Sequence, residues 1–390
     1  MPSLTKKYMF AVRAVGAAGA FGLGSWVLNH YPTLKEMWSD AMSLKPNTIK
    51  TRLPVAGKKL EQYTARDEFD DTIKLTLAKA PLDYYSILYG PKGAGKSELM
   101  NHVASDPTHK AVVFLNVFTT DTKSQILDKV MDGLLNKKIV GTTGYQECIE
   151  ALRLNATRVI QLSQDDAEKL AEYTPIVIFD VEIGVGDDQQ QGVAAVRSTA
   201  KALAPYVHCF VVLSEANAVL EFGKDRDREE YMLVGDFTEE QAVDFLKKLG
   251  SELDLSLDDR HRANGKQLRQ VFDKVGSRPA ALLAMHRSFE TPEEYVEGQL
   301  ADAELDLVVF PHKAILKALK EHPEGVEPEF FKNHKDERVD LSDPRAVAVA
   351  MKRSNAILYD MEEGRYKLMS KAHATALRGY EPILRSKGDS

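Results

Sequence analysis

The sequence is poor in cysteine, and this scarcity narrows the kinds of protein that it can encode. Its 390 residues include only Cys148 and Cys209, and neither cysteine belongs to a CxxC pair. The chain therefore has no disulfide scaffold, and a structural zinc or iron–sulfur site is not expected. Hydrophobic residues make up 44% and charged residues 28%, which excludes a mainly disordered, collagen-like or coiled-coil chain. The formal net charge of −7 excludes a wholly basic nucleic-acid binder but leaves room for a local basic face.

Acidic residues are absent from the N-terminus, where Glu36 is the first. The run Met9–Leu28 has Arg13 as its only charge, and as a helix it would reach about 30 Å, roughly one hydrocarbon core. We therefore expect residues 1–35 to hold a single-pass membrane anchor. Two alternatives stay open: a cleaved mitochondrial presequence, which is basic and poor in acid, and a glycine-rich helix buried in protein. Residues 36–60 combine prolines with mixed charge and no long periodic stretch, which predicts a linker.

A phosphate-binding loop is the most specific motif of the chain. Ser86–Tyr89 has the pattern of a short apolar strand and Glu98–Ala104 that of a helix, and the segment between them matches GxxxxGK(S/T). Glycines let the backbone amides of such a loop face phosphate oxygens, and the helix N-terminus adds positive potential. We expect Lys96 to reach the β- and γ-phosphates of a nucleotide and the Ser97 hydroxyl to bind Mg²⁺. The eight residues of the loop are Gly90, Pro91, Lys92, Gly93, Ala94, Gly95, Lys96 and Ser97.

A phosphate loop needs an acid that holds the magnesium ion, and one follows a second apolar strand. Ile176–Phe179 forms that strand and Asp180 ends it, so Asp180 is the expected Walker B aspartate. The base that activates water is less sharply defined. If the strand continues, Glu182 points to the same side as Asp180, because side chains alternate along a strand. We expect Glu182 to orient the attacking water. The alternative is that Glu182 only contacts the groups that bind the metal ion, without touching the water.

Strands and helices alternate around the phosphate loop. Besides the two strands above, three apolar runs have strand length, and helical patterns lie between them. This alternation predicts an α/β fold in which a parallel sheet has helices on both faces. We place this P-loop nucleotide-binding domain at residues 61–236. The additional strands are expected at 111–117, 209–214 and 231–235, and the helices at 121–137, 145–173 and 192–204, with Asp121 as the N-cap of the first helix.

Together, these parts resemble an AAA+-type ATPase, most closely the STAND branch and the related archaeal-type ATPases. The resemblance covers residues 61–390 and is most specific at the phosphate loop. In those families a short motif, often an arginine followed by acids, precedes the loop, and residues 63–69, YTARDEF, occupy that place. The resemblance also implies a polar sensor at the end of the fourth strand, which Ser214 or, alternatively, Asn217 supplies.

The same resemblance implies arginines that act on the nucleotide. Arg226 or Arg228 stands shortly before the fifth strand, where the families carry an arginine finger that stabilises charge on the transferring phosphoryl group. A solvated loop of alternating charges is the alternative. Residues 276–279 read GSRP and resemble the GxP motif of the STAND lid with one extra residue. Arg278 in this motif is expected to meet phosphate as a sensor arginine.

The last third of the chain is expected to be helical with one hairpin. Residues 237–300 have helical patterns, and Gln241 follows Thr238 at the spacing of a capping box. Residues 301–390 contain three short helical patterns followed by two strands around an acidic turn, which is the order of a winged helix. We therefore expect an α-helical lid followed by a winged-helix domain.

These expectations lead to an ATP- and Mg²⁺-dependent conformational switch, tethered to a membrane or imported into mitochondria, that acts on a protein client and can form homo-oligomers. The alternative is a nucleic-acid-dependent ATPase of the origin-recognition or helicase-loader kind. Glu362 and Glu363 in the wing turn disfavour DNA binding there, because DNA carries phosphate at every step. A small-molecule kinase is a third hypothesis, and it is the weakest because it needs neither lid nor winged helix.

Overall fold

The computed structural model describes the chain from residue 63 to residue 379 with several gaps, and the membrane anchor and linker predicted for residues 1–60 lie outside the described residues. Within these residues no helix combines the length and apolar character needed to cross a membrane. The described ranges are 63–81, 83–106, 109, 111–118, 121–135, 146, 149–157, 174–182, 189–213, 218–222, 228–252, 265–288, 292–332 and 339–379.

A five-stranded sheet forms the centre of the nucleotide-binding domain, and its strands are parallel and follow the order β2-β3-β4-β1-β5. The predicted α/β fold is therefore confirmed. The strands are β1 (Tyr85–Tyr89), β2 (Val112–Phe118), β3 (Ile176–Glu182), β4 (His208–Leu213) and β5 (Glu229–Leu233).

Strand β5 departs from the expected bounds, because it begins at Glu229 and ends at Leu233 rather than spanning residues 231–235. Two glutamates open the strand, and charged residues at a strand start are hard to recognise from sequence. Their side chains are paired across the sheet, where Glu229 accepts a hydrogen bond from Tyr85 at 2.7 Å and Glu230 accepts one from Ser86 at 3.0 Å.

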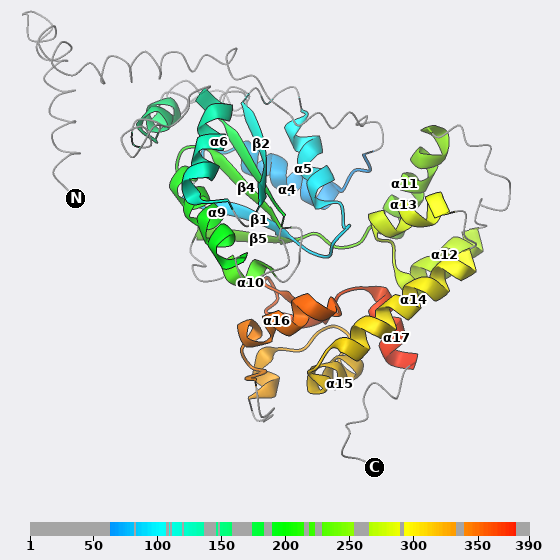
Figure 1. Cartoon of the computed structure of the whole chain (residues 1–390). Helices are drawn as coiled ribbons and strands as arrows, with labels where there is room; N and C mark the ends of the chain where they lie inside the picture. Colours follow the sequence, from blue (N-terminus) through cyan, green and yellow to red (C-terminus); the bar gives the residue numbers. More distant parts are fainter. Residues whose placement is uncertain are drawn as a thin grey trace, which may run out of the picture.

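Helices cover both faces of the sheet (Figure 1). Helices α4 (Asp67–Leu77) and α5 (Lys96–Ala104) pack on the face that includes Leu88. Helices α6 (Lys123–Leu135), α9 (Gln189–Leu203) and α10 (Val219–Phe222) share a core with Tyr85, Ile87 and Tyr89 on the other face. The alternation of β1 side chains therefore decides which residues face which layer.

Helix α6 is preceded by a capping box at Thr122, one residue after the predicted N-cap Asp121. The Thr122 amide donates to Gln125 Oε1 at 2.7 Å, and the Gln125 amide donates to Thr122 Oγ1 at 3.4 Å. Asp121, the expected cap, instead accepts a hydrogen bond from the Phe118 amide at the end of β2. The reason is Gln125, which lies three residues after Thr122 and completes a reciprocal pair of hydrogen bonds with it.

The helices that the structure describes after the sheet, up to Val309, lie to one side of it in Figure 1. The expected capping box at the start of the first is present, because the Thr238 amide donates to Gln241 Oε1 at 3.0 Å and the Gln241 amide donates back to Thr238 Oγ1 at 3.2 Å. These helices are α11 (Glu239–Glu252), α12 (Gly265–Val275), α13 (Pro279–Ser288) and α14 (Pro292–Val309).

The last part of the described chain has the winged-helix order. Strands β6 and β7 form an antiparallel hairpin, and an isolated bridge from Val326 to Tyr366 adds a short third segment. Its elements are α15 (Lys313–Glu321), the 3₁₀ helix η5 (Pro328–Phe331), α16 (Pro344–Ser354), β6 (Ile357–Asp360), β7 (Arg365–Leu368) and α17 (Lys371–Gly379).

Candidate active site

The phosphate loop connects the carboxyl end of β1 to the N-terminus of α5. Three of its residues, Gly90, Gly93 and Gly95, have positive φ angles of 143°, 80° and 88°, a region that side chains with a Cβ rarely adopt. A Cβ on Gly90 would lie 2.2 Å from the Val234 carbonyl oxygen, so this position also has no space for a side chain. The backbone path of the loop therefore favours glycine at all three positions.

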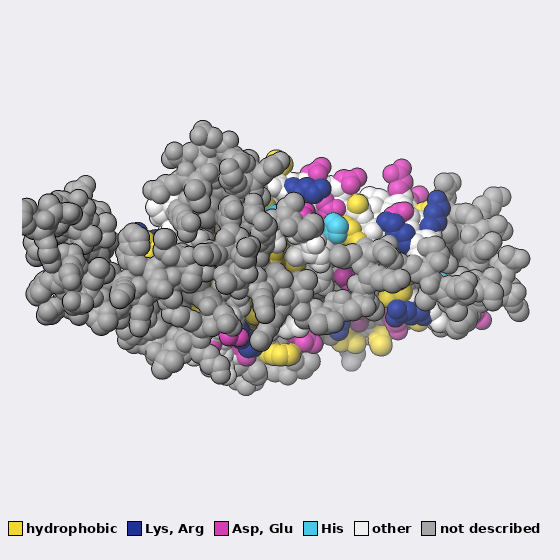
Figure 2. All heavy atoms as spheres, turned by 90° about the horizontal axis from the view of Figure 1, so that it is seen from above, with side chains coloured by type: hydrophobic (Ala, Val, Ile, Leu, Met, Phe, Trp, Pro, Cys, Tyr) yellow, Lys and Arg dark blue, Asp and Glu magenta, His cyan; other side chains and the backbone are white. Residues whose placement is uncertain are grey.

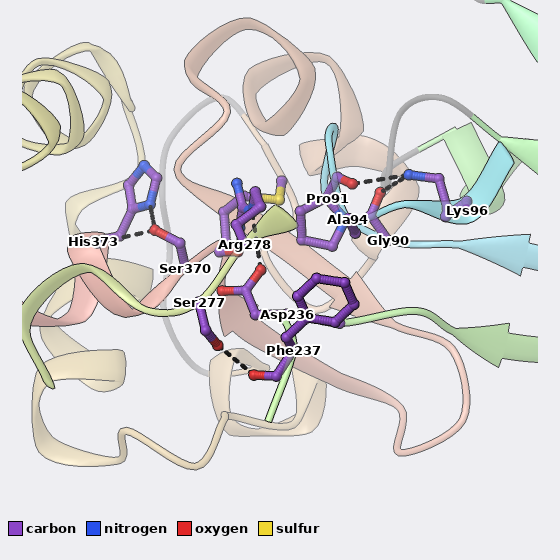
Figure 3. A network of polar contacts seen from close by, with 12 residues as sticks. Gly90, Pro91, Ala94, Lys96, Asp236, Phe237, Ser277, Arg278, Ser370 and His373 are labelled. Carbon is purple, nitrogen blue, oxygen red and sulfur yellow. Dashed lines mark hydrogen bonds and ion pairs between the residues drawn. The ribbon is translucent and has the colours of Figure 1, made fainter. Parts of the chain in front are cut away.

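Lys96 is buried at the first turn of α5 and is held by its own loop (Figure 3). Its Nζ donates hydrogen bonds to the carbonyl oxygens of Gly90 and Pro91, each at 2.9 Å. Burial, together with the positive charge of Arg278, lowers the pKa of Lys96 to about 7, although Asp180 acts in the opposite direction. A phosphate group would offer this lysine the anionic partner that two neutral carbonyls do not.

Asp180 and Ser97 lie together beside Lys96. Burial raises the pKa of Asp180, while a hydrogen bond from Ser97 and the charge of Lys96 oppose that rise. A carboxylate beside a hydroxyl is a suitable pair of oxygen ligands for Mg²⁺. Glu182 lies two residues further along β3, is exposed and is close enough to raise the pKa of Asp180. The structure therefore groups the three residues that the sequence proposed for magnesium and water.

Arg66, from the YTARDEF motif, is the contributor that the sequence indicated least clearly. It is 3% exposed, and its guanidinium donates to the carbonyl oxygens of Ala94 at 2.6 Å and Gly235 at 3.1 Å. The guanidinium also lies over the Phe237 ring, 4.5 Å from the centroid. Arg66 thus joins the phosphate loop to the segment that leads from β5 into α11. The signal in the sequence was a single arginine ahead of acids, which is also the pattern of an ordinary helix start.

Arg278 lies at the start of lid helix α13, beside the loop, but its partners are protein groups (Figure 3). Its Nε donates to Asp236 Oδ1 at 3.0 Å and its Nη2 donates to the Met369 carbonyl at 2.8 Å. The lid touches the loop directly as well, since the Ala280 amide donates to the Gly93 carbonyl at 3.1 Å. Neither Asp236 nor Met369 was indicated by a sequence motif, because their roles depend on tertiary placement alone.

Arg228 lies at the opposite end of the sheet from the phosphate loop. It precedes Glu229, and Glu229 is in register with Tyr85 at the start of β1, whereas the loop follows Tyr89. The loop begins at Gly90, five residues after Tyr85, which is roughly 16 Å along the strand. Within one subunit Arg228 is therefore far from Lys96, and an action on nucleotide would have to come from a neighbouring subunit. Ser214, Asn217 and Arg226 lie outside the described residues.

The residues present fit a magnesium-bound nucleoside triphosphate. Arg66, Lys96 and Arg278 bring three positive charges around one loop, and both arginines lower the pKa of Lys96. Positive φ angles of the loop glycines set the backbone path of the loop, and the Ser97–Asp180 pair supplies oxygen donors for a cation. This combination of basic side chains and one acid at a glycine-rich loop suits a polyphosphate with a bound cation better than a neutral ligand.

A family described as an ATPase domain predominantly from Archaea has a sequence profile that matches residues 73–285. This span is more than half of the 390 residues. The chain belongs to this ATPase family. The expected resemblance to archaeal-type ATPases is therefore confirmed, while the assignment to the STAND branch stays a prediction. No individual curated protein matched the chain.

Several solved structures align with this ATPase at low identity. The ORC1 protein of Aeropyrum pernix in complex with DNA is 13% identical, covers 83% of this chain and 94% of its own, and has a TM-score of 0.35. A RuvB variant from Thermotoga maritima is 13% identical with 80% and 96% coverage and a TM-score of 0.33. Drosophila ORC bound to DNA is 15% identical with 45% and 96% coverage and a TM-score of 0.29. Scores this low carry no inference about activity, which has to come from the site itself.

Proposed function

We propose that this ATPase binds ATP with Mg²⁺ at the phosphate loop and hydrolyses it to drive a conformational switch. The observation that supports this proposal is the convergence of Lys96, Arg66 and Arg278 on one glycine-rich loop, with Ser97 and Asp180 beside the lysine. Bound ATP supplies the phosphoanhydride bond, and Mg²⁺ neutralises its oxygens. Ser97 and Asp180 would hold the cation.

Each side chain has a distinct task in this proposal. Lys96 leaves the carbonyls of Gly90 and Pro91 for phosphate oxygens, which a charge-assisted hydrogen bond favours. Arg278 would likewise exchange its present partners, Asp236 and the Met369 carbonyl, for phosphate oxygens. Glu182, exposed beside Asp180, orients the attacking water. If Arg278 moves to phosphate, it loses its hydrogen bond to the Met369 carbonyl. ATP binding would therefore change the contact between the lid, which contains Arg278, and the winged helix, which contains Met369.

Nucleic-acid-dependent hydrolysis is the second candidate, and the winged-helix order is the observation that favours it. Arg345 is exposed at the start of α16, the third helical element of this module. The wing turn is less suitable, because it carries Glu362 and Glu363 and contacts the ATPase core through Glu362. Figure 2 shows acidic and basic side chains interspersed on the described part of one face. The two candidates therefore share the same ATPase site and differ in the partner on which hydrolysis acts.

The membrane tether at residues 9–28 and the use of Arg226 or Arg228 in a homo-oligomer stay predictions. An anchored protein resists alkaline carbonate extraction and becomes extractable when residues 1–35 are deleted. A trans-acting arginine makes specific activity rise with protein concentration. Full extraction of the intact chain by carbonate would contradict the membrane anchor. A specific activity that does not change with protein concentration would contradict the trans-acting arginine.

The experiment that tests the proposed function is a phosphate-release assay on the full chain with MgATP, alone and with added DNA or RNA. We expect hydrolysis without nucleic acid and its loss in an Asp180→Ala variant, because the metal site then lacks its acid. Strict dependence on DNA or RNA would favour the second candidate. No hydrolysis under any of these conditions would contradict ATP turnover by this chain.

A further inference from the structure

The turn of the wing reaches the strand that leads into the phosphate loop. Tyr89, the last residue of β1, is fully buried, and its hydroxyl donates to Asp360 Oδ1 at 3.1 Å. The same hydroxyl accepts a hydrogen bond from the Met361 amide at 2.9 Å. One tyrosine of the nucleotide-binding domain therefore satisfies both a carboxylate and an amide of the winged helix.

Asp360 is fixed from its own side of this contact. It is 2% exposed, and its carboxylate accepts hydrogen bonds from Lys367 Nζ at 2.9 Å and from the amides of Glu362 and Glu363 at 3.0 and 3.2 Å. Burial alone would raise the pKa of Asp360, but the hydrogen bonds from Lys367 and the Glu363 amide lower it overall. Several groups of the wing therefore hold the Asp360 carboxylate while it accepts the hydrogen bond from Tyr89.

Tyr89 is coupled to the phosphate loop through the backbone. Gly90 follows it directly, and the Tyr89 carbonyl accepts a hydrogen bond from the Val234 amide at 2.8 Å. Gly90 itself packs so closely on the Val234 carbonyl that a Cβ would approach to 2.2 Å. The Gly90 carbonyl is also one of the two acceptors that hold Lys96. A change in the position of Tyr89 is therefore passed to the carbonyl that competes with phosphate for this lysine.

The winged helix makes two further contacts around the same site. Glu362 Oε1 accepts a hydrogen bond from the Leu233 amide at 3.3 Å, at the end of the neighbouring strand β5. The Met369 carbonyl accepts from Arg278 at 2.8 Å. With the winged helix docked in this way, Lys96 and Arg278 both form hydrogen bonds to groups of the protein itself.

From these contacts we infer that Tyr89 is a positioning residue of the nucleotide site, and that Asp360 of the wing sets its position. This inference rests on the proposed function, because it concerns how the same loop receives phosphate. With the wing docked, Tyr89 holds Gly90 where its carbonyl retains Lys96. Without the Tyr89–Asp360 contact, the loop adapts more readily to phosphate, so ATP binds more tightly.

The chain offers a matched control on the same strand. Tyr85 is 1% exposed, and its hydroxyl also donates to a carboxylate, Glu229, at 2.7 Å. It lies at the other end of β1, and its hydroxyl bonds within the sheet rather than to the wing. Tyr85→Phe and Tyr89→Phe therefore remove the same group from the same strand, and only the second change breaks the contact with the wing.

The test measures the Kd of a fluorescent ATP analogue with Mg²⁺ for the full-length wild type, Tyr85→Phe, Tyr89→Phe, Asp360→Asn and the Tyr89→Phe/Asp360→Asn double variant. We expect Tyr89→Phe to lower the Kd about threefold to tenfold, and Tyr85→Phe to leave it within about twofold. Asp360→Asn should have the same direction, and the double variant should add little to either single change. Equal Kd values for the two Phe variants, weaker binding by Tyr89→Phe, or additive effects would overturn the inference.

A second readout needs no nucleotide and separates this inference from the proposed function. Amide hydrogen exchange of residues 90–95 should be faster in Tyr89→Phe and Asp360→Asn than in Tyr85→Phe, while thermal unfolding verifies that each variant is folded. If the wild type binds no ATP analogue, the proposed function fails, and exchange still reports whether the wing positions the loop. Unchanged exchange in both Tyr89→Phe and Asp360→Asn would contradict the positioning role by itself.

Discussion

The two ends of strand β1 carry the same residue type in very different settings. At the amino end the Tyr85 hydroxyl donates to Glu229, which also accepts from Arg197 at 2.8 Å and from Tyr231 at 2.5 Å. At the carboxyl end Tyr89 meets the wing and is followed by the phosphate loop. Three strand residues lie between the two tyrosines, which are roughly 13 Å apart along the strand.

The difference lies in how charge is balanced. At the amino end one buried carboxylate is shared among an arginine and two hydroxyls of the same domain, which is a self-contained structural cluster. At the carboxyl end three cations gather around the loop, and their present partners include neutral carbonyls. Parallel sheets place ligands at the carboxyl ends of their strands, where helix N-termini and loops converge. The amino end therefore contributes stability, and the carboxyl end is available for chemistry.

Glu229→Ala should damage only the amino end. Removing this buried carboxylate leaves Arg197 and two tyrosine hydroxyls without their shared acceptor, so we expect the free energy of unfolding to fall by about 3–5 kcal/mol. Urea unfolding measures this loss. The Kd for MgATP of the folded fraction should stay within about twofold of the wild-type value. Loss of ATP binding at an unchanged free energy of unfolding would contradict the assignment of stability to the amino end and of ligand binding to the carboxyl end.

Much of the carboxyl end was predictable from sequence, because its constraints are local. The loop glycines, Lys96, Ser97 and Asp180 are fixed by a strand–loop–helix pattern and by strand ends. Asp236, Met369 and Tyr89 were not predictable, since their partners lie far away in the chain: the bond from Tyr89 to Asp360 spans 271 residues. The charged start of β5 was missed for a similar reason, because Glu229 is paired across the sheet and not along the chain.

Glu182→Gln should act on turnover at the carboxyl end without disturbing binding. Loss of the charge that orients water is expected to lower kcat about a hundredfold at nearly constant KM, because the side chain keeps its size. Glu98→Gln is the matched control, since Glu98 is another exposed acid close to the loop. Steady-state phosphate release provides both constants. Equal kcat values for the two variants would assign the water to another residue.

Gly93→Ala should weaken the contact between loop and lid. Its φ of 80° is strained for alanine, and the new Cβ would lie 2.5 Å from the Ala280 Cβ. We expect a rise in the Kd for MgATP of about thirtyfold, equivalent to about 2 kcal/mol. Gly298→Ala in α14 is the control, because a Cβ at that position would meet no neighbouring atom within 4 Å. Similar Kd values for both variants would show that lid packing is irrelevant to the site.

The pH dependence of MgATP binding tests the charge of Lys96 at the carboxyl end of β1. Lys96 has a pKa lowered to about 7, so it is mostly charged at pH 6 and mostly neutral at pH 8 in the free protein. Phosphate binds the charged form, so the Kd for MgATP should rise up to about tenfold between pH 6 and pH 8. Lys96→Arg should flatten this profile, because arginine stays charged throughout. A wild-type Kd independent of pH would contradict this ionisation of Lys96.

The most direct measurement of the central claim is calorimetric titration of MgATP into the full-length wild type, Lys96→Ala and Lys92→Ala. Both lysines belong to the loop, but the Lys96 side chain is buried within it and the Lys92 side chain is exposed. The account predicts that Lys96→Ala raises the Kd at least about a hundredfold, while Lys92→Ala changes it less than about threefold. Equal Kd values for a folded Lys96→Ala protein and the wild type would contradict ATP binding at this loop.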